Sequence, residues 1–298
     1  SNVSFAVLLF SALGYFFPAF GAGNNLLSIV CASVFLWFLT ALVLRGVKEA
    51  AGINTIVTLA KLVPLGLFVL SIVLLGKFNV DIFMDNFWGE PAGPGFGEQV
   101  VSTMIALVWV FTGIEGAVVI SGRAKYVRDV GRSTALGFAA VFTLYLIISM
   151  LSLGIMPREE MAQLATPSMA GILECAIGPV GAAIVNLGVI LSLVGALLGY
   201  VIIASETPFE AARQGSFPLA FAKTNKHDAP VVTVLVSSGI TQLFLIVSYV
   251  AASTYQFFYS CAVNTILVPY VCSAAYYMVI GWKKEHLDGP HAPSVGKA

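Results

Sequence analysis

The sequence predicts an all-α integral membrane protein, on the evidence of its composition, its long apolar runs and the distribution of its basic residues. Of its 298 residues, 58% are hydrophobic and only 10% are charged. A soluble domain carries about 25% charged residues. Because so few charges cannot cover a water-facing surface, much of the surface must face lipid.

The apolar runs are long enough to cross a bilayer, which takes about 20 residues at about 1.5 Å per residue. We expect about eight transmembrane helices in a bundle over residues 1–281, followed by a polar tail at 282–298. The expected helices cover roughly residues 1–20, 23–44, 51–76, 101–121, 134–156, 176–204, 230–250 and 255–280. Glycine, proline and asparagine mark the connectors, as in Gly21-Ala22-Gly23-Asn24-Asn25. The first run is apolar almost at once, which indicates a helix cut near its start rather than a signal peptide.

Basic residues gather on alternate connectors. Twelve of the 15 lie on one set of connectors: Arg45, Lys48, Arg123, Lys125, Arg128, Arg132, Arg213, Lys223, Lys226, Lys283, Lys284 and Lys297. The opposite set carries only Lys77 and Arg158. Because basic connectors stay in the cytoplasm, we expect the first set and the C-terminal tail to be cytoplasmic. The acidic connector at 77–100 should face outward.

The same composition argues against several other classes of protein. A net charge of zero gives no reason to expect a nucleic-acid partner. The four cysteines and three histidines lack metal-ligand spacing, so no metal or cofactor is predicted. No phosphate-binding loop, dinucleotide fingerprint, nucleophile elbow or catalytic cluster is present, so we do not expect an enzyme.

A glycine-flanked carboxylate interrupts the fourth expected helix, in Trp109-Val110-Phe111-Thr112-Gly113-Ile114-Glu115-Gly116. Each glycine costs about 1 kcal/mol against alanine within a helix, so the pair favours local unwinding. Unwound backbone at membrane depth is tolerated where it lines a cavity, and there it can bind a polar ligand. Close helix packing, with Glu115 near the inner interface, explains the pattern equally well.

Three further residues lie in apolar surroundings. Lys61 falls roughly 15 Å into the third expected helix, so it needs a buried partner or marks a solute pathway. Glu206 closes the sixth expected helix and is expected to meet interfacial water. Tyr200 lies inside that helix, where an aromatic residue is more often a core or lipid-facing side chain than part of a binding site.

The expected topology permits an internal symmetry. Helices one to three start inside, outside and inside, whereas helices six to eight start outside, inside and outside. A five-helix offset relates the two triplets by inverted topology, which is common in secondary transporters.

Three motifs resemble the amino acid–polyamine–organocation superfamily, and within it the basic amino acid exchangers, especially bacterial arginine–ornithine antiporters. They are Trp109-x-Phe111-x-Gly113-x-Glu115 with its basic connector, Ala211-Ala212-Arg213-Gln214-Gly215-Ser216-Phe217-Pro218 leading to Lys223-x-Asn225-Lys226-His227, and Asn2 with the stretch ending Gly14-Tyr15-Phe16-Phe17-Pro18. The resemblance covers nearly the whole chain. It implies a LeuT-like inverted-repeat fold, which has twelve helices in this family. This chain is similar to helices three to ten, so the fold that it forms is expected to be incomplete.

The resemblance also implies a substrate site. Trp109 matches an aromatic residue that stacks over the substrate side chain, where a cation gains cation–π attraction. Thr112, Gly113, Ile114 and Gly116 match the segment that contacts the substrate α-amino group.

Four more residues match family positions. Asn2 matches an asparagine that contacts the guanidinium end of arginine, and Glu115 matches a glutamate of a gate or proton-sensitive element. Tyr200 stands where some relatives have a tryptophan of the inner gate, a departure that affects gating and selectivity. Lys61 matches a lysine that occupies the place of a sodium ion and supports coupling.

The expected function is exchange of cationic amino acids, chiefly arginine for ornithine, by alternating access across the bacterial inner membrane. A proton-coupled lysine or arginine permease is the alternative within transport. A non-transporting membrane scaffold or sensor is the alternative of another class. The expected partners are the cationic substrates and the lipid bilayer, and assembly as a homodimer stays open.

Overall fold

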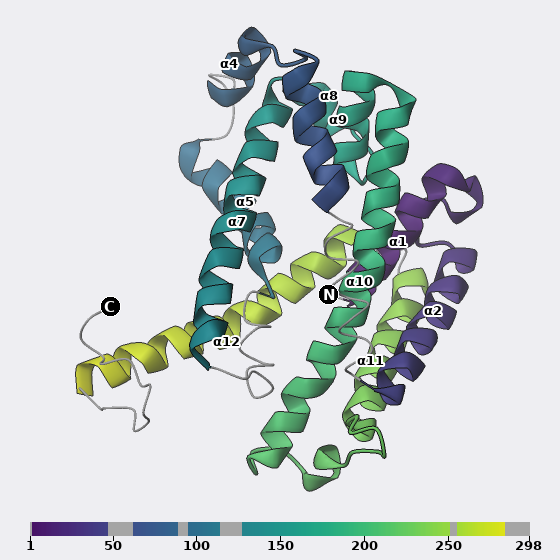
Figure 1. Ribbon diagram of the computed structural model, residues 1–298, viewed down its shortest axis with the longest axis vertical. Coiled ribbons are helices and arrows are strands. Elements are labelled where there is room, and N and C mark those ends of the chain that lie inside the picture. Colours follow the sequence, from purple (N-terminus) through teal and green to yellow (C-terminus); the bar gives the residue numbers. More distant parts are fainter. Residues whose placement is uncertain (1, 47–61, 89–94, 114–126, 251–254, 284–298) are drawn as a thin grey trace. The chain divides into compact units, whose positions relative to one another are not determined.

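The computed structural model describes residues 2–46, 62–88, 95–113, 127–250 and 255–283 (Figure 1). In these ranges the regular structure is helical, and an isolated bridge between Thr224 and Pro230 is the one β-type pairing. The all-α prediction is confirmed for this part of the chain. The chain forms two compact units: Ser1–Gly93 with Phe138–Phe258, and Pro94–Gly137 with Tyr259–Ala298.

Five of the described helices are long and apolar enough to cross a membrane. They are α2 (Leu26–Arg45), Asp129–Leu153 within α7 (Val127–Leu153), α10 (Pro179–Arg213), α11 (Val231–Val250) and Ser260–Val279 within α12 (Tyr255–Lys283). Shorter apolar helices are α1 (Asn2–Phe16), Leu62–Leu74, α5 (Phe96–Phe111) and α9 (Ser168–Ile177). The number of about eight spans and the inverted repeat stay predictions, because parts of the expected spans 51–76 and 101–121 lie outside the described residues.

A tight connector reverses the chain between α1 and α2. Pro18 cannot continue α1 and opens the short 3-10 helix η1 (Pro18–Phe20). Gly21 then adopts a φ of +53°, a conformation that favours glycine. Asn25 caps α2, because its Oδ1 accepts the N–H of Ser28 at 2.9 Å while its Nδ2 donates to the carbonyl of Ala19 at 2.7 Å. The predicted loop is therefore a hydrogen-bonded turn.

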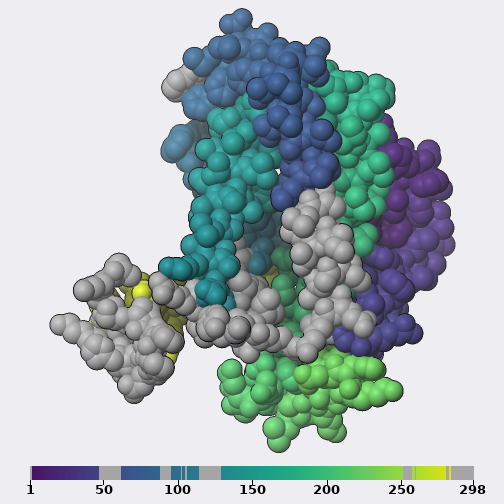
Figure 2. Space-filling model, viewed as in Figure 1, coloured from purple at the N-terminus to yellow at the C-terminus, as the bar shows by residue number. Residues whose placement is uncertain are grey.

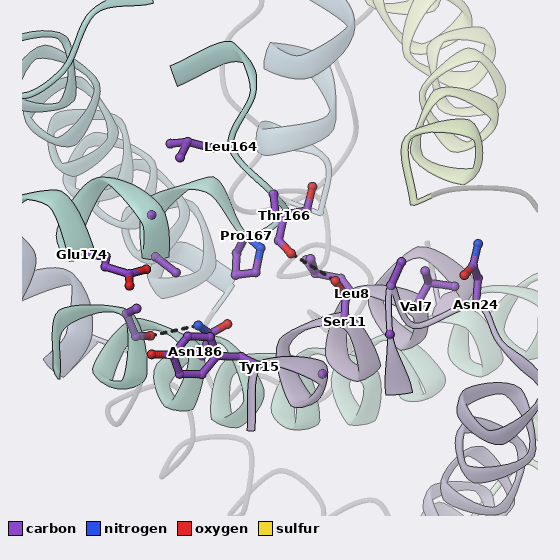
Figure 3. Close-up of a pocket in the computed structure, with 17 residues that line it drawn as sticks. Val7, Leu8, Ser11, Tyr15, Asn24, Leu164, Thr166, Pro167, Glu174 and Asn186 are labelled. Carbon is purple, nitrogen blue, oxygen red and sulfur yellow. Dashed lines mark hydrogen bonds between the residues drawn. The ribbon is translucent and has the colours of Figure 1, made fainter. Parts of the chain in front are cut away.

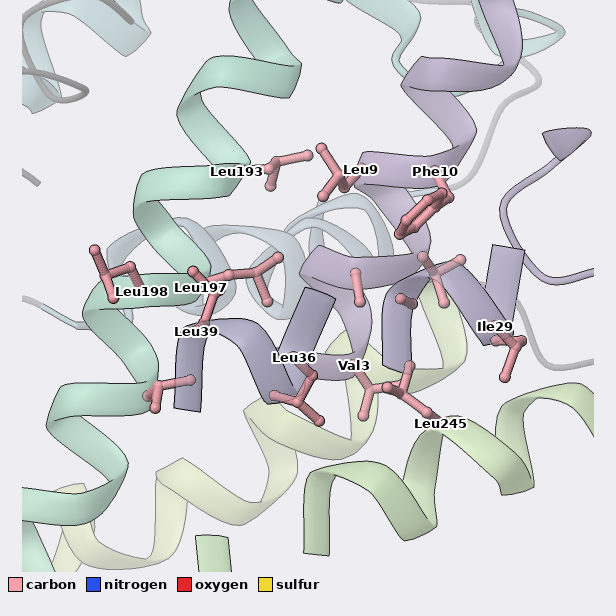
Figure 4. Packing of buried hydrophobic residues seen from close by; sticks show 14 of the residues in the cluster. Val3, Leu9, Phe10, Ile29, Leu36, Leu39, Leu193, Leu197, Leu198 and Leu245 are labelled. Carbon is pink, nitrogen blue, oxygen red and sulfur yellow. The ribbon is translucent and has the colours of Figure 1, made fainter. Parts of the chain in front are cut away.

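The core of the larger unit lies where α1, α2, α10 and α11 meet (Figure 4). Leu193 and Leu197 of α10 reach toward α1, while Leu36 of α2 and Leu245 of α11 close the cluster from other sides. Lipid tails are as apolar as leucine, so close packing and hydrogen bonds, more than the hydrophobic effect, hold helices together in a membrane.

Hydrogen bonds between side chains join α2 to α11. Thr40 donates its hydroxyl hydrogen to the Leu36 carbonyl at 2.8 Å, so it accepts from the Ser238 hydroxyl, which is also 2.8 Å away. Farther along the same pair of helices, the amide of Gln242 donates to the Ser33 hydroxyl at 2.9 Å. Such bonds contribute about 0.6 kcal/mol each in membrane proteins and fix the register of the two helices.

Helix α10 is longer than the sequence predicts and contains Pro208. Proline lacks an N–H, so the carbonyl of Ala204, four residues earlier, loses its helical donor. The hydroxyl of Ser237 on α11 donates to that carbonyl at 3.1 Å. A neighbouring helix thus supplies the missing hydrogen bond, which allows α10 to continue to Arg213.

The extension of α10 changes the environment of Glu206. The sequence analysis expects this residue to meet interfacial water at the end of the sixth helix. In the structure the helix passes it, and Glu206 is only 3% exposed. The expectation is wrong for the residues described, because the length of α10 was underestimated.

Asn225 organises the connector between α10 and α11, which also contains the 3-10 helix η3 (Leu219–Ala222). Its Oδ1 accepts the N–H groups of His227 and Ala229, and its Nδ2 donates to the carbonyl of Leu44 at 2.7 Å. Because Leu44 lies in the last turn of α2, Asn225 caps that helix from a distant segment. The motif residue Asn225 therefore has a structural role.

A second buried cluster joins the helix Leu62–Leu74 to α9 and α10. Gly188 of α10 permits close contact there, since an added Cβ would collide with the ring of Pro64. Nearby, α4 (Val80–Trp88) is held by Asn86, whose Nδ2 donates to the carbonyls of Leu153 and Met156. The N–H of Arg158, the first residue of α8 (Arg158–Ala162), donates to Asn86 Oδ1 at 2.9 Å.

Large apolar side chains remain exposed on the outside of this unit. On α2, for example, Val34 is 68% exposed and Phe38 is 61% exposed. In Figure 2 the purple residues of α1 and α2 form one edge of the visible surface. An apolar outer face of this kind fits a helix that contacts lipid.

The smaller unit contains α5, the first turns of α7 and most of α12. Helix α12 has Pro269 in its interior. Helix α5 ends at Phe111, within the motif that the sequence analysis singles out.

Candidate functional site

Two of the predicted site residues, Asn2 and Tyr200, lie together where α1 packs against α10. Tyr200 packs its ring against that of Phe5, with centroids 5.1 Å apart and planes at 64°. Phe5 lies one helical turn from Asn2, so the two residues share a face of α1. Leu197, one turn before Tyr200, lines a small cavity together with Asn2. The structure thus places the amide of Asn2 and the ring of Tyr200 at the interface between α1 and α10.

Asn2 has an unusual buried atom. Its Oδ1 is inaccessible to solvent and has no hydrogen-bond partner among the residues that the structure describes. The cavity beside it measures about 10 Å³ and is walled by residues that include Leu36, Thr241 and Leu245. A space of roughly 10–15 Å³ holds one water molecule. Because an unpaired buried acceptor is costly, Asn2 is suited to accept a hydrogen bond from a ligand or a single water.

Three other predicted site residues lie at the end of α5, in the smaller unit. Trp109 is in the last turn, and Thr112 ends the helix with an extended backbone, at φ −64° and ψ 130°. Gly113 then has a φ of +106°, which favours glycine. Helix α5 therefore ends at the point where the glycine pattern predicts a break.

The end of α5 offers polar main-chain groups beside Trp109. Thr112 donates its N–H to the Trp109 carbonyl at 3.2 Å and its hydroxyl to the Val108 carbonyl at 2.8 Å. The C-terminal end of a helix carries negative partial charge. Such an end attracts a cationic group, for example an ammonium.

The remaining predicted residues, Lys61, Ile114, Glu115 and Gly116, lie outside the described residues. Their predicted roles in coupling, gating and substrate contact stay predictions. Asn2 and Tyr200 belong to the larger unit, and Trp109, Thr112 and Gly113 belong to the smaller one.

A larger cavity lies elsewhere in the larger unit. It measures about 680 Å³ and is enclosed by α1, the connector after it, the segment between α8 and α9, α9 itself and the start of α10 (Figure 3). A volume of roughly 300–1,000 Å³ is typical of small-molecule sites. Its polar side chains are those of Ser11, Tyr15, Asn24, Thr166, Glu174 and Asn186, and the rest of the wall is glycine and apolar residues.

No pattern in the sequence predicted this cavity. Glu174 was not singled out, because α9 is a short helix outside the expected spans. Asn186 lies in a long apolar run where one amide carries little signal. A weak signal was present nonetheless, since an uncharged polar side chain within a membrane helix usually has a hydrogen-bonding role.

Comparisons with known proteins agree with the motifs. The sequence model of a family described as amino acid permease matches residues 1–296. The chain is 43% identical over 293 residues to an arginine/ornithine antiporter of Pseudomonas aeruginosa, covering 95% of this chain and 60% of that protein. It is 38% identical over 285 residues to an arginine/ornithine antiporter of Latilactobacillus sakei, covering 94% and 60%.

A relative with a different printed activity also matches. The chain is 35% identical over 292 residues to an arginine/agmatine antiporter of Chlamydia pneumoniae, covering 96% of this chain and 60% of that protein. The chain therefore spans about 60% of the length of these relatives.

Proposed function

We propose that this chain, which belongs to the amino acid permease family, forms the central part of a secondary exchanger of cationic amino acids, with arginine and ornithine as its substrates. The names of the similar antiporters support this choice of substrates. The protein performs no covalent chemistry, since its work is to move a bound solute across a bacterial inner membrane.

The observation that carries the proposal is the end of α5 at the Trp109–Gly113 motif. The helix stops one turn after Trp109, with extended backbone at Thr112 and a left-handed glycine at Gly113. An interrupted helix at membrane depth is a means of exposing main-chain carbonyl groups to a solute. We infer that the substrate α-ammonium binds at this negative helix end, in contact with Thr112, Gly113, Ile114 and Gly116.

The aromatic and amide residues bind the substrate side chain in this proposal. The indole of Trp109 stacks over the cationic side chain, an attraction of about 0.5–2 kcal/mol. Asn2 contacts the guanidinium end of the substrate through a single water molecule, because the cavity beside its buried Oδ1 has room for no more. This assignment explains why an amide oxygen is buried without a partner among the described residues. Tyr200, whose ring packs against that of Phe5, contributes to the inner gate.

Two charged residues couple binding to the conformational change in this proposal. Lys61 supplies a fixed positive charge between helices, and Glu115 belongs to the gate and responds to protons. Intramembrane charges are expensive and are usually placed on solute pathways. Exchange follows if the empty carrier reorients poorly and a bound cation favours the transition between outward-open and inward-open states.

Counterflow in liposomes tests the proposed function. The complete protein is reconstituted, and uptake of radiolabelled arginine is measured into vesicles that contain ornithine, lysine, agmatine or buffer alone. We expect rapid uptake with internal ornithine and little uptake into empty vesicles. Uptake into empty vesicles driven by a proton gradient would instead establish the proton-coupled permease. No uptake under either condition would favour the scaffold or sensor.

A further inference from the structure

Three basic residues gather at the end of α2, where the connector between α10 and α11 folds against that helix (Figure 1). Asn225 of the connector donates to the carbonyl of Leu44 at 2.7 Å. Arg45 follows Leu44 directly and Lys226 follows Asn225, so this hydrogen bond brings basic residues from distant parts of the chain to one end of the larger unit. Lys223 lies three residues before Lys226 in the same connector. We call Arg45, Lys223 and Lys226 the basic surface.

The basic surface carries positive charge that no acidic residue offsets within the described part of the chain. All three side chains are exposed, and none forms an ion pair with a described residue. Arg213 at the end of α10 differs, because it pairs with Glu210 at 3.0 Å. The connector at 214–230 contains one acidic residue, Asp228. The surplus of positive charge is therefore available to an anion.

The apolar spans set the depth of the basic surface in the membrane. The apolar stretch of α2 ends at Arg45, and that of α11 begins at Val231. The hydrogen bond between Asn225 and Leu44 holds the connector at this pair of span ends. The ends of membrane spans lie at the level of the lipid headgroups. The three basic residues are thus placed where phosphate groups of lipids are found.

Exposed apolar side chains in the same connector favour a lipid over a soluble anion. Leu219 in η3 is 77% exposed, and Phe217 is 43% exposed. The ring of Phe217 packs edge-on against that of Phe221, with centroids 4.8 Å apart. Basic residues combined with exposed leucine and phenylalanine are typical of segments that lie in the membrane interface. A soluble anion would use the charges and leave these apolar groups uncovered.

We infer that the basic surface binds the headgroup phosphate of an anionic phospholipid, and that Leu219 and Phe217 contact the acyl chains of this lipid. The guanidinium of Arg45 can donate two N–H groups to one phosphate, while the lysine ammonium groups act as point charges. By the positive-inside rule the lipid belongs to the cytoplasmic leaflet. The inference does not depend on which amino acids the protein exchanges.

Quenching by brominated lipids tests the inference. In a cysteine-free form of the complete protein, Ala220→Cys is labelled with a bimane fluorophore, because Ala220 is exposed in η3 beside Leu219. The protein is reconstituted into mixtures of phosphatidylglycerol and phosphatidylcholine in which one or the other lipid is brominated. The two quenching curves give the relative affinity of the surface for the two lipids. We expect phosphatidylglycerol to be preferred about 10- to 100-fold at low salt, since each base contributes a factor of about five.

Charge variants should move this preference in both directions. Lys223→Gln and Lys226→Gln should each lower it about three- to fivefold, and high salt should lower it further. Asp228→Asn removes the acidic residue of the connector and should raise the preference about two- to fivefold. Asparagine tolerates the positive φ of 58° at this position, so the backbone can stay as it is. An increase in affinity cannot result from a misfolded variant.

Two controls separate this site from general contact with lipid. A bimane at Val34→Cys reports on the outer face of α2, where Val34 is 68% exposed, and it should show no preference between the two lipids. Lys77→Gln removes an exposed base from the opposite set of connectors and should leave the quenching at position 220 unchanged.

Three results would overturn the inference. The first is a bimane at position 220 that neither brominated lipid quenches, as expected if water or another segment of the complete protein covers the connector. The second is a preference that does not respond to Lys223→Gln, Lys226→Gln and Asp228→Asn. The third is displacement of phosphatidylglycerol by soluble glycerol phosphate, which would assign the surface to a soluble anion. Exchange of arginine for ornithine is measured separately, so a failure of the proposed function can be distinguished from a failure of the lipid site.

Discussion

At the scale of single residues, unsatisfied polar atoms point to ligands more directly than charges do. Asn2 and Asn186 each bury an amide oxygen without a partner among the described residues. Both residues line cavities in the larger unit. An unpaired buried acceptor costs about 1–3 kcal/mol, so a water molecule or a ligand that donates to it would stabilise the protein.

Asn2→Leu separates a binding role from a structural one. Because Oδ1 has no partner to lose, the empty variant should be as thermally stable as the wild type or slightly more stable. Its affinity for arginine should fall by about 2- to 10-fold, as expected when one water-mediated hydrogen bond is lost. Thermal unfolding with and without arginine measures both quantities. A clear drop in the melting temperature of the empty protein would contradict the binding role.

Trp109→Leu tests the cation–π contact against a matched control. We expect arginine to bind about 3- to 30-fold more weakly, which corresponds to roughly 0.5–2 kcal/mol. Trp37 is a tryptophan on the surface of α2 with no matching role, and Trp37→Leu should leave the affinity unchanged. Titration calorimetry gives both affinities. Equal values for the two variants would remove Trp109 from the site.

Lys61→Ala tests the proposed coupling charge. Removing the ammonium should abolish or uncouple exchange of arginine for ornithine, while the full-length protein still inserts into the membrane. Lys77, an exposed base in an outer connector, supplies the control variant Lys77→Ala. Exchange is measured in liposomes from pH 5 to pH 8. Wild-type rates for Lys61→Ala across that range would show that the proposed role is wrong.

At the scale of helices, neighbouring elements supply hydrogen bonds to main-chain carbonyl groups that lack a donor in their own helix. The interior Pro208 deprives the Ala204 carbonyl of its donor, and Ser237 of α11 replaces it. The last turn of α2 is capped by Asn225 from the distant connector between α10 and α11. In a membrane, where water cannot satisfy main-chain groups, these contacts determine where a helix can bend or end.

A double-mutant cycle tests the contact between α10 and α11. Ser237→Ala should lower the free energy of unfolding by about 1 kcal/mol, because the Ala204 carbonyl loses its donor. In a Pro208→Ala background the new N–H at position 208 can bond that carbonyl, so Ser237→Ala should cost almost nothing. Reversible unfolding in detergent gives the four stabilities. Equal costs of Ser237→Ala in both backgrounds would contradict this account of Pro208.

At the scale of the whole molecule, the distribution of charge implies an orientation in the membrane. Basic residues on alternate connectors predict that the connector between α10 and α11 is cytoplasmic and that the one around Lys77 faces outward. Exposed apolar side chains on α2, such as those of Val34 and Phe38, fit a lipid-facing surface.

Labelling of single cysteines tests the orientation. In a variant without its four native cysteines, Lys77→Cys should react with a membrane-impermeant maleimide added to intact cells. Lys226→Cys should react only after the membrane is opened. Both positions are exposed, so burial does not limit the reaction. The opposite pattern of labelling would invert the proposed topology and would place the cavity beside Glu174 on the cytoplasmic side.

The sequence alone indicated the all-α class, the apolar segments that correspond to α2, α10 and α11, and the interruption at Gly113. These features depend on local properties, namely apolar length and the conformational freedom of glycine, so a linear pattern can reveal them. The short helix α9 was missed, because its ten residues are too few to cross a membrane, whereas the start of α10 at Pro179 lies close to the expected start at residue 176.

Only the tertiary structure decided which polar groups find partners. Glu206 is buried because α10 passes Pro208 with the help of Ser237, and no local pattern around Glu206 encodes that distant hydroxyl. The ring of Phe5 contacts that of Tyr200, and Glu174 and Asn186 line the same cavity, because helices far apart in the sequence pack together. The physical reason is that a polar atom in a membrane protein is satisfied or left unpaired by its neighbours in space, which the order of residues does not specify.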